Sequence, residues 1–236
     1  MKFTQIRSGS KANLYTLDAD NGNRLLIECG LPYPKLLDAL DYKIDNIKGC
    51  IISHFHGDHS KSAKDLIKNG MDVYASEGTL RGLKIQGLRR TSTSYDGLEE
   101  HGFKVVAFDA QHDCEGAKFF IIGCDGKSML FSTDNYWIDQ EFRAMQFNII
   151  ALECSFDEDI LQRKVEKKEI NEELAKRLLF SHMSNKRCHK YLDEKCDLGK
   201  CEEIHLLHMS GSNIVKDRVR QEFEDKYMIE TFVVGD

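Results

Sequence analysis

The sequence predicts an α/β domain in which two stacked sheets carry helices on their outer faces, a layered α/β sandwich. Short apolar runs bounded by glycine-bearing or polar turns fill the first third of the chain, with helical spacing between some of them. A second group of strand-like runs follows further on. Among 236 residues there are two prolines, both near the start, and no Ser/Gly-rich linker, so we expect one domain over residues 1–236.

The expected elements follow from the spacing of apolar residues and from the turn and capping residues beside them. We expect strands at residues 2–7, 14–18, 24–29, 49–53, 104–108, 117–123, 128–132, 148–153, 203–208 and 228–234. We expect helices at residues 34–40, 60–69, 168–179, 185–195 and 215–224. Ser60 is expected to cap the second helix, and the Asp125-Gly126 pair predicts a tight turn.

Composition limits the classes of protein that the chain can belong to. The net charge of −6 argues against a surface coated in basic residues for gripping long nucleic acid, and we interpret the lysine- and arginine-bearing stretches as solvated faces. The longest apolar runs are shorter than the ~20 residues that cross a membrane. The start of the chain has no uninterrupted apolar stretch typical of an export signal, so we expect a cytoplasmic protein whose eight cysteines form no disulfide.

One short segment concentrates metal-binding chemistry. Directly after an apolar strand, three imidazoles and a carboxylate occur within six positions, at His54, His56, Asp58 and His59. Imidazole and carboxylate are ligands that divalent metals such as zinc prefer. The spacing lets His54 and His56 face one ion, while Asp58 and His59 face a second. The alternative is an exposed histidine-rich loop that binds no metal.

This His-x-His-x-Asp-His pattern resembles the signature of the metallo-β-lactamase superfamily. Three further residues match that family's ligands in order, each near the end of an apolar strand: His112, Asp134 and His208. The resemblance implies a four-layer αββα sandwich with two divalent metal ions, zinc or manganese, with iron also compatible. It further implies that His112 completes the shell of the first ion, Asp134 bridges both ions and His208 binds the second.

Other segments resemble the small YycJ/WalJ-like branch of the superfamily and its relatives tRNase Z and RNase J. They are the opening loop from Ser8 to Asn13, the segment around Glu153, and the Ser-His-Met-Ser-Asn run that contains His182. In tRNase Z-like enzymes the matching Glu and His form a proton-supplying pair. The resemblance therefore implies Asp58, Glu153 and His182 as catalytic residues, although Glu153 and His182 also fit a structural pair or an extra metal ligand.

The chain departs from these nuclease relatives in two respects. Only 18 residues separate Asp134 from Glu153, so the large inserted domain of RNase J-like nucleases is absent. We see no segment that matches the long arm with which tRNase Z-like enzymes hold tRNA. A structured RNA substrate is therefore not supported by the resemblance.

The resemblance implies a hydrolase, most simply a dinuclear metal-dependent phosphodiesterase or nuclease acting on DNA or RNA. The expected partner is then a nucleic acid or nucleotide substrate, and no membrane. Two alternatives stay open: a phosphodiesterase for small molecules such as cyclic nucleotides, which needs only a compact pocket, and a non-catalytic metal-binding module. The remaining histidines, among them His189 and His205, are expected to serve the surface or packing.

Overall fold

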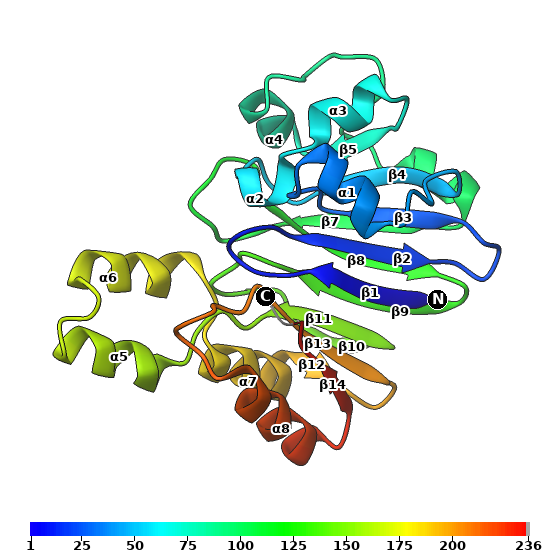
Figure 1. Cartoon of the computed structure of the whole chain (residues 1–236). Helices are drawn as coiled ribbons and strands as arrows, with labels where there is room; N and C mark the ends of the chain where they lie inside the picture. Colours follow the sequence, from blue (N-terminus) through cyan, green and yellow to red (C-terminus); the bar gives the residue numbers. More distant parts are fainter. Residues whose placement is uncertain (235–236) are drawn as a thin grey trace. The chain divides into compact units, whose positions relative to one another are not determined.

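The computed structural model describes residues 1–234, and the last two residues of the predicted domain lie outside the described residues. The described chain is a mixed α/β structure of multi-stranded sheets and helices, as predicted (Figure 1). It divides into unit 1, residues 1–109 and 114–127, and unit 2, residues 110–113 and 128–234. One domain over residues 1–236 stays a prediction.

Unit 1 contains a six-stranded sheet, a strand hairpin and short helices. The sheet strands are β1 (Lys2–Arg7), β2 (Leu14–Asp18), β3 (Arg24–Ile27), β4 (Ile47–Ile52), β5 (Val73–Ala75) and β6 (Thr91–Ser92). The hairpin consists of β7 (Lys104–Asp109) and β8 (Lys118–Cys124). The helices are α1 (Tyr33–Ala39), α2 (Gly57–Ser60), α3 (Ala63–Lys68), α4 (Glu77–Gly82) and the 3-10 helix η1 (Asp96–His101).

The sheet of unit 1 changes from antiparallel to parallel at β3. Strands run in the order β1-β2-β3-β4-β5-β6; the first two pairs are antiparallel and the following three are parallel. Leu26 and Ile52 from the sheet pack in one apolar cluster with Leu36 of α1, Leu66 of α3 and Leu80 of α4. Burial on both faces explains the continuous apolar runs of β3 and β4.

Unit 2 is built around parallel strands. They are β9 (Lys127–Ser132), β11 (Ile149–Glu153), β13 (Glu203–Leu207) and β14 (Glu230–Phe232), and they pair in that order. The first residue of β9, Lys127, still belongs to unit 1. A separate parallel pair joins β10 (Phe142–Gln146) to β12 (Cys196–Asp197). The helices are α5 (Glu158–Glu166), α6 (Glu172–Ser181), α7 (Asn185–Lys195) and α8 (Lys216–Tyr227).

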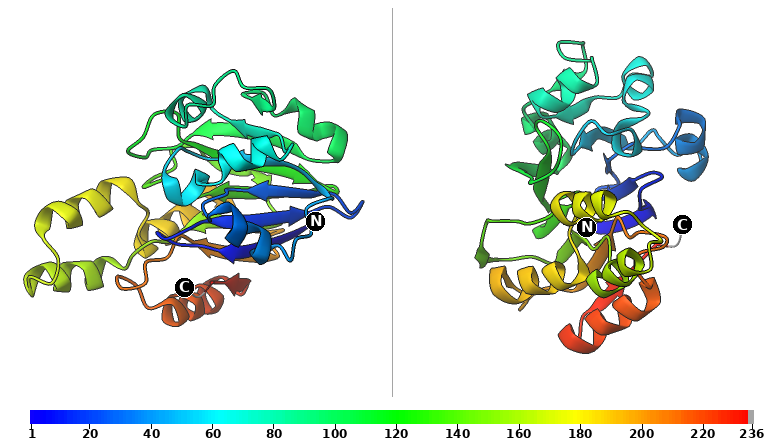
Figure 2. Two further views of the ribbon diagram at one scale, coloured as in Figure 1. Left: turned by 45° about the horizontal axis from the view of Figure 1, so that its top comes forward. Right: turned by 90° about the vertical axis from the view of Figure 1, so that its left-hand side faces the viewer.

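Helices α5 and α6 form a hairpin that the sequence does not predict in full. The two helices lie side by side in Figure 1 and in the left-hand view of Figure 2. Phe156, Leu161 and Ala175 form a small buried cluster between them. The expected helix at residues 168–179 corresponds to α6, whereas α5 was missed because it carries few apolar residues. Its start is stabilised by Asp157, whose carboxylate accepts two backbone N–H groups of the first turn.

The predicted helix at residues 60–69 is wrong in its first turn. The chain forms two short helices there, α2 and α3. Helix α2 already begins at Gly57, inside the histidine motif, as we call the His-x-His-x-Asp-His run of residues 54–59. Ser60 ends α2, and its hydroxyl donates a 2.8 Å hydrogen bond to the carbonyl oxygen of His56 instead of capping a helix. The predicted turn is confirmed: Asp125 and Gly126 have φ of 54° and 71°, the positive values of a type I′ turn.

Two findings concern the whole described chain. None of the helices within residues 1–234 combines the length and apolar character needed to cross a membrane. All eight cysteines lie in the described part, and none is joined to another in a disulfide.

Helix α7 contains a histidine whose charged form is disfavoured. The His189 ring stacks on Phe223 of α8 with centroids 3.9 Å apart, and its Nδ1 lies 3.0 Å from the Tyr227 hydroxyl. Burial, followed by the positive charge of Lys226, lowers the pKa of His189 to about 4, while Asp193 opposes this shift weakly. Folding is therefore favoured when this imidazole is neutral.

We predict that this histidine makes the protein less stable in acid. Because the pKa of an unfolded histidine is about 6.5, the unfolded chain binds a proton at His189 before the folded chain does as the pH falls. The contribution is present above pH 6.5 and is lost between that pH and about 4. Thermal unfolding from pH 7 to 4.5 should give a steeper fall in Tm for the wild type than for His189→Gln. Equal slopes would contradict the prediction.

Candidate functional site

Polar side chains follow neighbouring parallel strands in unit 1. Strand β3 is followed directly by Glu28, and β4 by Ser53 and His54. Because β3 and β4 are parallel, with Ile27 paired to Ile51, their carboxyl ends lie at the same edge of the sheet. Glu28 takes a positive φ of 64° at this point, which turns the chain out of the strand. The edge of the sheet therefore collects the chemistry-bearing side chains of this unit.

The structure brings the predicted ligands of the histidine motif close together. Nε2 of His54 lies 3.1 Å from Nδ1 of His56, and the rings of His54 and His59 have centroids 4.1 Å apart. The hydroxyl of Ser53 lies 2.8 Å from Nδ1 of His54 and orients that ring. Nε2 of His59 lies 3.4 Å from the carboxylate of Asp58. Three imidazoles and a carboxylate thus meet on one short loop.

Backbone contacts hold this loop against the opening segment of the chain. The N–H of Asn13 donates to the carbonyl oxygen of Asp58 at 2.7 Å, and the N–H of Gly30 donates to the carbonyl of Asn13 at 2.9 Å. The N–H of Cys29 donates to the carbonyl oxygen of His59, also at 2.7 Å. A side chain at Gly30 would collide with Asp58, because its Cβ would lie 1.7 Å from the Asp58 oxygen. Only glycine allows this approach.

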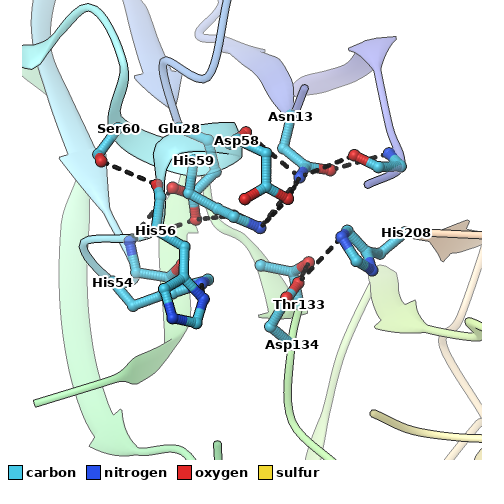
Figure 3. Close-up of polar contacts among 12 residues, drawn as sticks. Asn13, Glu28, His54, His56, Asp58, His59, Ser60, Thr133, Asp134 and His208 are labelled. Atoms are coloured by element: carbon cyan, nitrogen blue, oxygen red, sulfur yellow. Dashed lines mark hydrogen bonds and ion pairs between the residues drawn. The ribbon is translucent and has the colours of Figure 1, made fainter. Parts of the chain in front are cut away.

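Two further side chains contact the motif: Asn13, the last residue of the opening loop that the resemblance marked, and Glu28, which the sequence did not single out. The Asn13 amide donates to Nε2 of His59 at 3.0 Å and lies 3.5 Å from an Asp58 carboxylate oxygen (Figure 3). Glu28 is fully buried; its carboxylate accepts the N–H of Ser53 at 3.2 Å and lies 3.7 Å from Nδ1 of His59. Burial raises the pKa of Glu28, although the neighbouring His59 opposes the shift. Both side chains fix the orientation of the His59 ring.

Unit 2 repeats the arrangement of functional residues at strand ends. Asp134 follows β9, Glu153 ends β11 and His208 follows β13. Since the three strands are parallel, with Glu153 paired to Leu207, these residues share one edge of the sheet. Asp134 and His208 both have positive φ, 43° and 52°. Nε2 of His208 lies 3.6 Å from the Asp134 carboxylate (Figure 3).

Glu153 and His182 form the hydrogen-bonded pair that the resemblance implies. Nδ1 of His182 donates to the Glu153 carboxylate at 2.6 Å, and the backbone N–H groups of Asn135 and Met183 donate to its other oxygen. Burial raises the pKa of Glu153, but the charge and hydrogen bond of His182 outweigh this and lower it to about 2. Burial lowers the pKa of His182, whereas Glu153 raises it above its ordinary value. The pair therefore favours a charged imidazolium beside a carboxylate.

His112 lies next to the predicted bridging aspartate. Its Nδ1 donates to the carbonyl oxygen of Ser181 at 2.9 Å, which fixes the ring. Its Nε2 lies 3.7 Å from the Asp134 carboxylate and 3.2 Å from Asp113. Unit 2 thus brings together five residues that the sequence placed in the site: His112, Asp134, Glu153, His182 and His208.

The donor atoms in each unit fit a divalent metal ion. In unit 2, one ligand atom each from Asp134, Glu153, His182 and His208 lie within 4.8 Å of one another. In unit 1, ligand atoms of His54, His56 and Cys114 meet the same limit. Imidazole nitrogens, carboxylates and thiolates are the donors that bind zinc and related metals in proteins.

Cys114, like Glu28, was missed from the sequence, whereas Asn13 belongs to the opening loop that the resemblance had marked. It lies outside the His-x-His-x-Asp-His run and pairs with no second cysteine at a zinc-ribbon spacing. The one available signal is its position two residues after His112. Histidines expected to have packing roles are held elsewhere: His205, for example, bonds to Glu203 at 2.8 Å and stacks on Phe232.

Comparison with known sequences gives relatives for the first quarter and for the whole chain. The family described as "Anti-Pycsar protein Apyc1" matches residues 8–72, which contain Asn13, Glu28 and the whole histidine motif. A protein of that description from Bacillus phage 010DV004 is 38% identical over 65 residues, 25% of this chain and only 25% of its own length. An "Exodeoxyribonuclease YycJ" of Bacillus anthracis is 22% identical over 100% of this chain and 92% of its own length.

Solved structures show the fold. The metallo-β-lactamase fold protein YhfI from Bacillus subtilis has a TM-score of 0.70 at 15% identity, covering 99% of this chain and 95% of its own. Zn²⁺-bound PqqB from Methylobacterium extorquens has 0.71 at 12%, covering 100% and 98%. Human tRNase Z, short form, has 0.63 at 14%, covering 100% and 97%. The chain has the metallo-β-lactamase fold, and the predicted fold class is confirmed.

We predict that Gly30 is required for the loop of the histidine motif. Gly30→Ala should force the Asp58 backbone away, because the added methyl group would overlap the carbonyl oxygen of Asp58. We expect a loss of about 1–3 kcal/mol in the free energy of unfolding and fewer divalent ions bound per chain. Thermal or urea unfolding and elemental analysis measure these effects.

Gly57→Ala is the matched control, since it lies in the same loop and a Cβ there would meet no atom within 4 Å beyond its adjacent residues and the backbone of its own helix. It should leave both stability and metal content close to those of the wild type. Wild-type unfolding and metal content in Gly30→Ala would show that the close approach has no such role.

Proposed function

We propose that this chain is a metal-dependent phosphodiesterase that cleaves DNA or RNA, a nuclease of the metallo-β-lactamase fold. The observation that carries the proposal is the Glu153–His182 pair, 2.6 Å apart, beside the candidate metal ligands Asp134 and His208. Phosphodiester cleavage releases an alkoxide, which needs a proton, and a histidine held in its charged form is suited to supply it. The similarity to a protein called an exodeoxyribonuclease supports the same reaction class.

We further propose the ligand assignment that the metallo-β-lactamase resemblance implies. One ion would be held by His54, His56 and His112, a second by Asp58, His59 and His208, with Asp134 between them. Zinc or manganese suits these donors, and iron is also compatible. Bound divalent ions would supply Lewis acidity, which activates water and neutralises charge on a phosphoryl oxygen.

The protein's own residues would carry the proton transfers and the positioning. His182 donates from Nε2, because Nδ1 is engaged by Glu153. Glu153, fixed by two backbone N–H groups, keeps the ring oriented and its positive charge stabilised. Asp58 is held by Asn13 through both its backbone and its side chain, so its carboxylate stays aimed at the site.

The net charge of −6 favours a second candidate, a phosphodiesterase for small nucleotides. A long polyanion binds through many phosphate contacts and is repelled by the negative charge of an acidic protein, whereas a small nucleotide makes few such contacts. The salt dependence of binding separates the two, because each phosphate contact adds to the loss of affinity with salt. A non-catalytic metal-binding module is the third candidate.

We predict metal-dependent hydrolysis in a panel of phosphodiesters. The substrates are bis-p-nitrophenyl phosphate, labelled single- and double-stranded DNA, RNA and cyclic nucleotides, tested with zinc- or manganese-loaded protein. Chelation and His56→Ala should abolish cleavage. Shortening of the polymers supports the nuclease, and turnover of cyclic nucleotides alone supports the second candidate. A folded, metal-loaded protein that cleaves none of them would leave only the non-catalytic module.

We predict a leaving-group signature for His182. His182→Gln should lower kcat on DNA by about 10²–10⁴-fold, the usual contribution of general acid catalysis. It should lower hydrolysis of bis-p-nitrophenyl phosphate far less, because p-nitrophenolate leaves without a proton. Metal content should stay at the wild-type level, since the proposal does not count His182 as a ligand. Equal losses on both substrates together with a lost ion would instead identify His182 as a ligand.

A further inference from the structure

A thiol lies beside the first two histidines of the motif. Within unit 1, Sγ of Cys114 and one ring nitrogen each of His54 and His56 are all within 4.8 Å of one another. Ligand atoms around one tetrahedral zinc ion are about 3.5 Å apart, given bonds of about 2.0–2.3 Å. Small side-chain rotations would therefore bring the three atoms onto one ion.

Hydrogen bonds of the residues that follow Cys114 in the sequence fix its position. Just after it, the N–H of Lys118 donates to the carbonyl oxygen of Ser53 at 3.0 Å, which joins the start of β8 to the end of β4. The Ser76 hydroxyl donates to the carbonyl oxygen of Gly116 at 2.5 Å. A Cβ at Gly116 would lie 2.5 Å from the same hydroxyl, and Gly116 has a positive φ of 76°. The segment that follows Cys114 is thus anchored to the same sheet edge as His54.

The other cysteines do not share this setting. Six of them are buried: Cys29, Cys50, Cys124, Cys154, Cys188 and Cys196. Cys201 is half-buried like Cys114, and its thiol donates to the carbonyl oxygen of Glu203 at 3.4 Å, but within the described residues it belongs to no group of potential metal ligands. Within the described residues of unit 1, Cys114 is the cysteine whose sulfur lies in a group of potential metal ligands together with histidine nitrogens.

We propose that Cys114 is a thiolate ligand of the metal ion held by His54 and His56, and that it makes this site selective for zinc over manganese. The inference rests on the proposed function only in that His54 and His56 bind a metal. On binding, the S–H bond breaks, a sulfur–metal bond forms and the proton passes to the buffer, with no change of oxidation state. Thiolates bind zinc and cobalt well and manganese poorly, which gives the selectivity.

The first test uses Co²⁺ as a spectroscopic probe of metal-depleted wild-type protein. A sulfur ligand gives a sulfur-to-cobalt charge-transfer absorption in the near ultraviolet, and we expect this band for the wild type. Cys114→Ser should lose it, while the matched control Cys201→Ser should keep it. Wild-type protein that binds cobalt without showing this band would overturn the proposal. A band that persists in Cys114→Ser would overturn it as well.

The second test measures zinc and manganese affinity. Removing a residue that only hydrogen-bonds to a metal ligand lowers metal affinity by about 10–100-fold. Removing a direct ligand should cost at least as much, so Cys114→Ser should weaken zinc binding by about tenfold or more. Manganese affinity should change by less than about twofold, because manganese gains little from sulfur. Equal losses for both metals would contradict the selectivity.

A measurement on the wild type guards against misfolding of the variant. Zinc should protect Cys114, but not Cys201, from alkylation by iodoacetamide, as peptide mass spectrometry would show. Equal labelling with and without bound zinc would overturn the ligand role. These results separate the two proposals: a sulfur band without phosphodiester cleavage supports Cys114 and counts against the nuclease, whereas cleavage without the band does the reverse. Failure to bind any metal would overturn both.

Discussion

Parallel strand pairing is the constraint on which the candidate site depends. Neighbouring parallel strands end at the same edge of a sheet, so residues at their carboxyl ends become neighbours although they are far apart in sequence. In unit 1 this edge receives Glu28 and His54, and in unit 2 it receives Asp134, Glu153 and His208. A slip of one residue in either register would displace the end of that strand, and the side chain that follows it, by about 3.3 Å along the sheet.

The histidine loop of unit 1 needs more than its strand. Backbone hydrogen bonds from Asn13 and Cys29 to the carbonyl groups of Asp58 and His59 hold it from one side, and Gly30 makes room for the contact. Asn13 serves twice, since its amide also contacts the side chains that its backbone positions. Stability and ligand geometry are therefore linked at the same residue.

The sequence predicted most strands and placed the candidate ligands near strand ends, because apolar runs followed by His or Asp are local patterns. It also predicted the contact between Glu153 and His182, but only through resemblance to other proteins. Glu28 and Cys114 gain their place from contacts between distant segments, which no local pattern reports, and the resemblance marked the loop of Asn13 but not the contacts of its side chain. Helix α5 was missed for the opposite reason: it is stabilised by its cap and by a partner helix rather than by a strong apolar face.

The positive φ angles of Glu28, Asp134 and His208 have a consequence for how this protein can change. A non-glycine residue in the left-handed region costs on the order of 1–3 kcal/mol when the surroundings impose it. Selection for stability alone would favour glycine or asparagine at such points. At these three positions the side chain also contributes to the candidate site, which neither glycine nor asparagine would reproduce. A descendant that lost this chemistry would gain stability by replacing them, so these positions would be expected to drift early once function was no longer maintained.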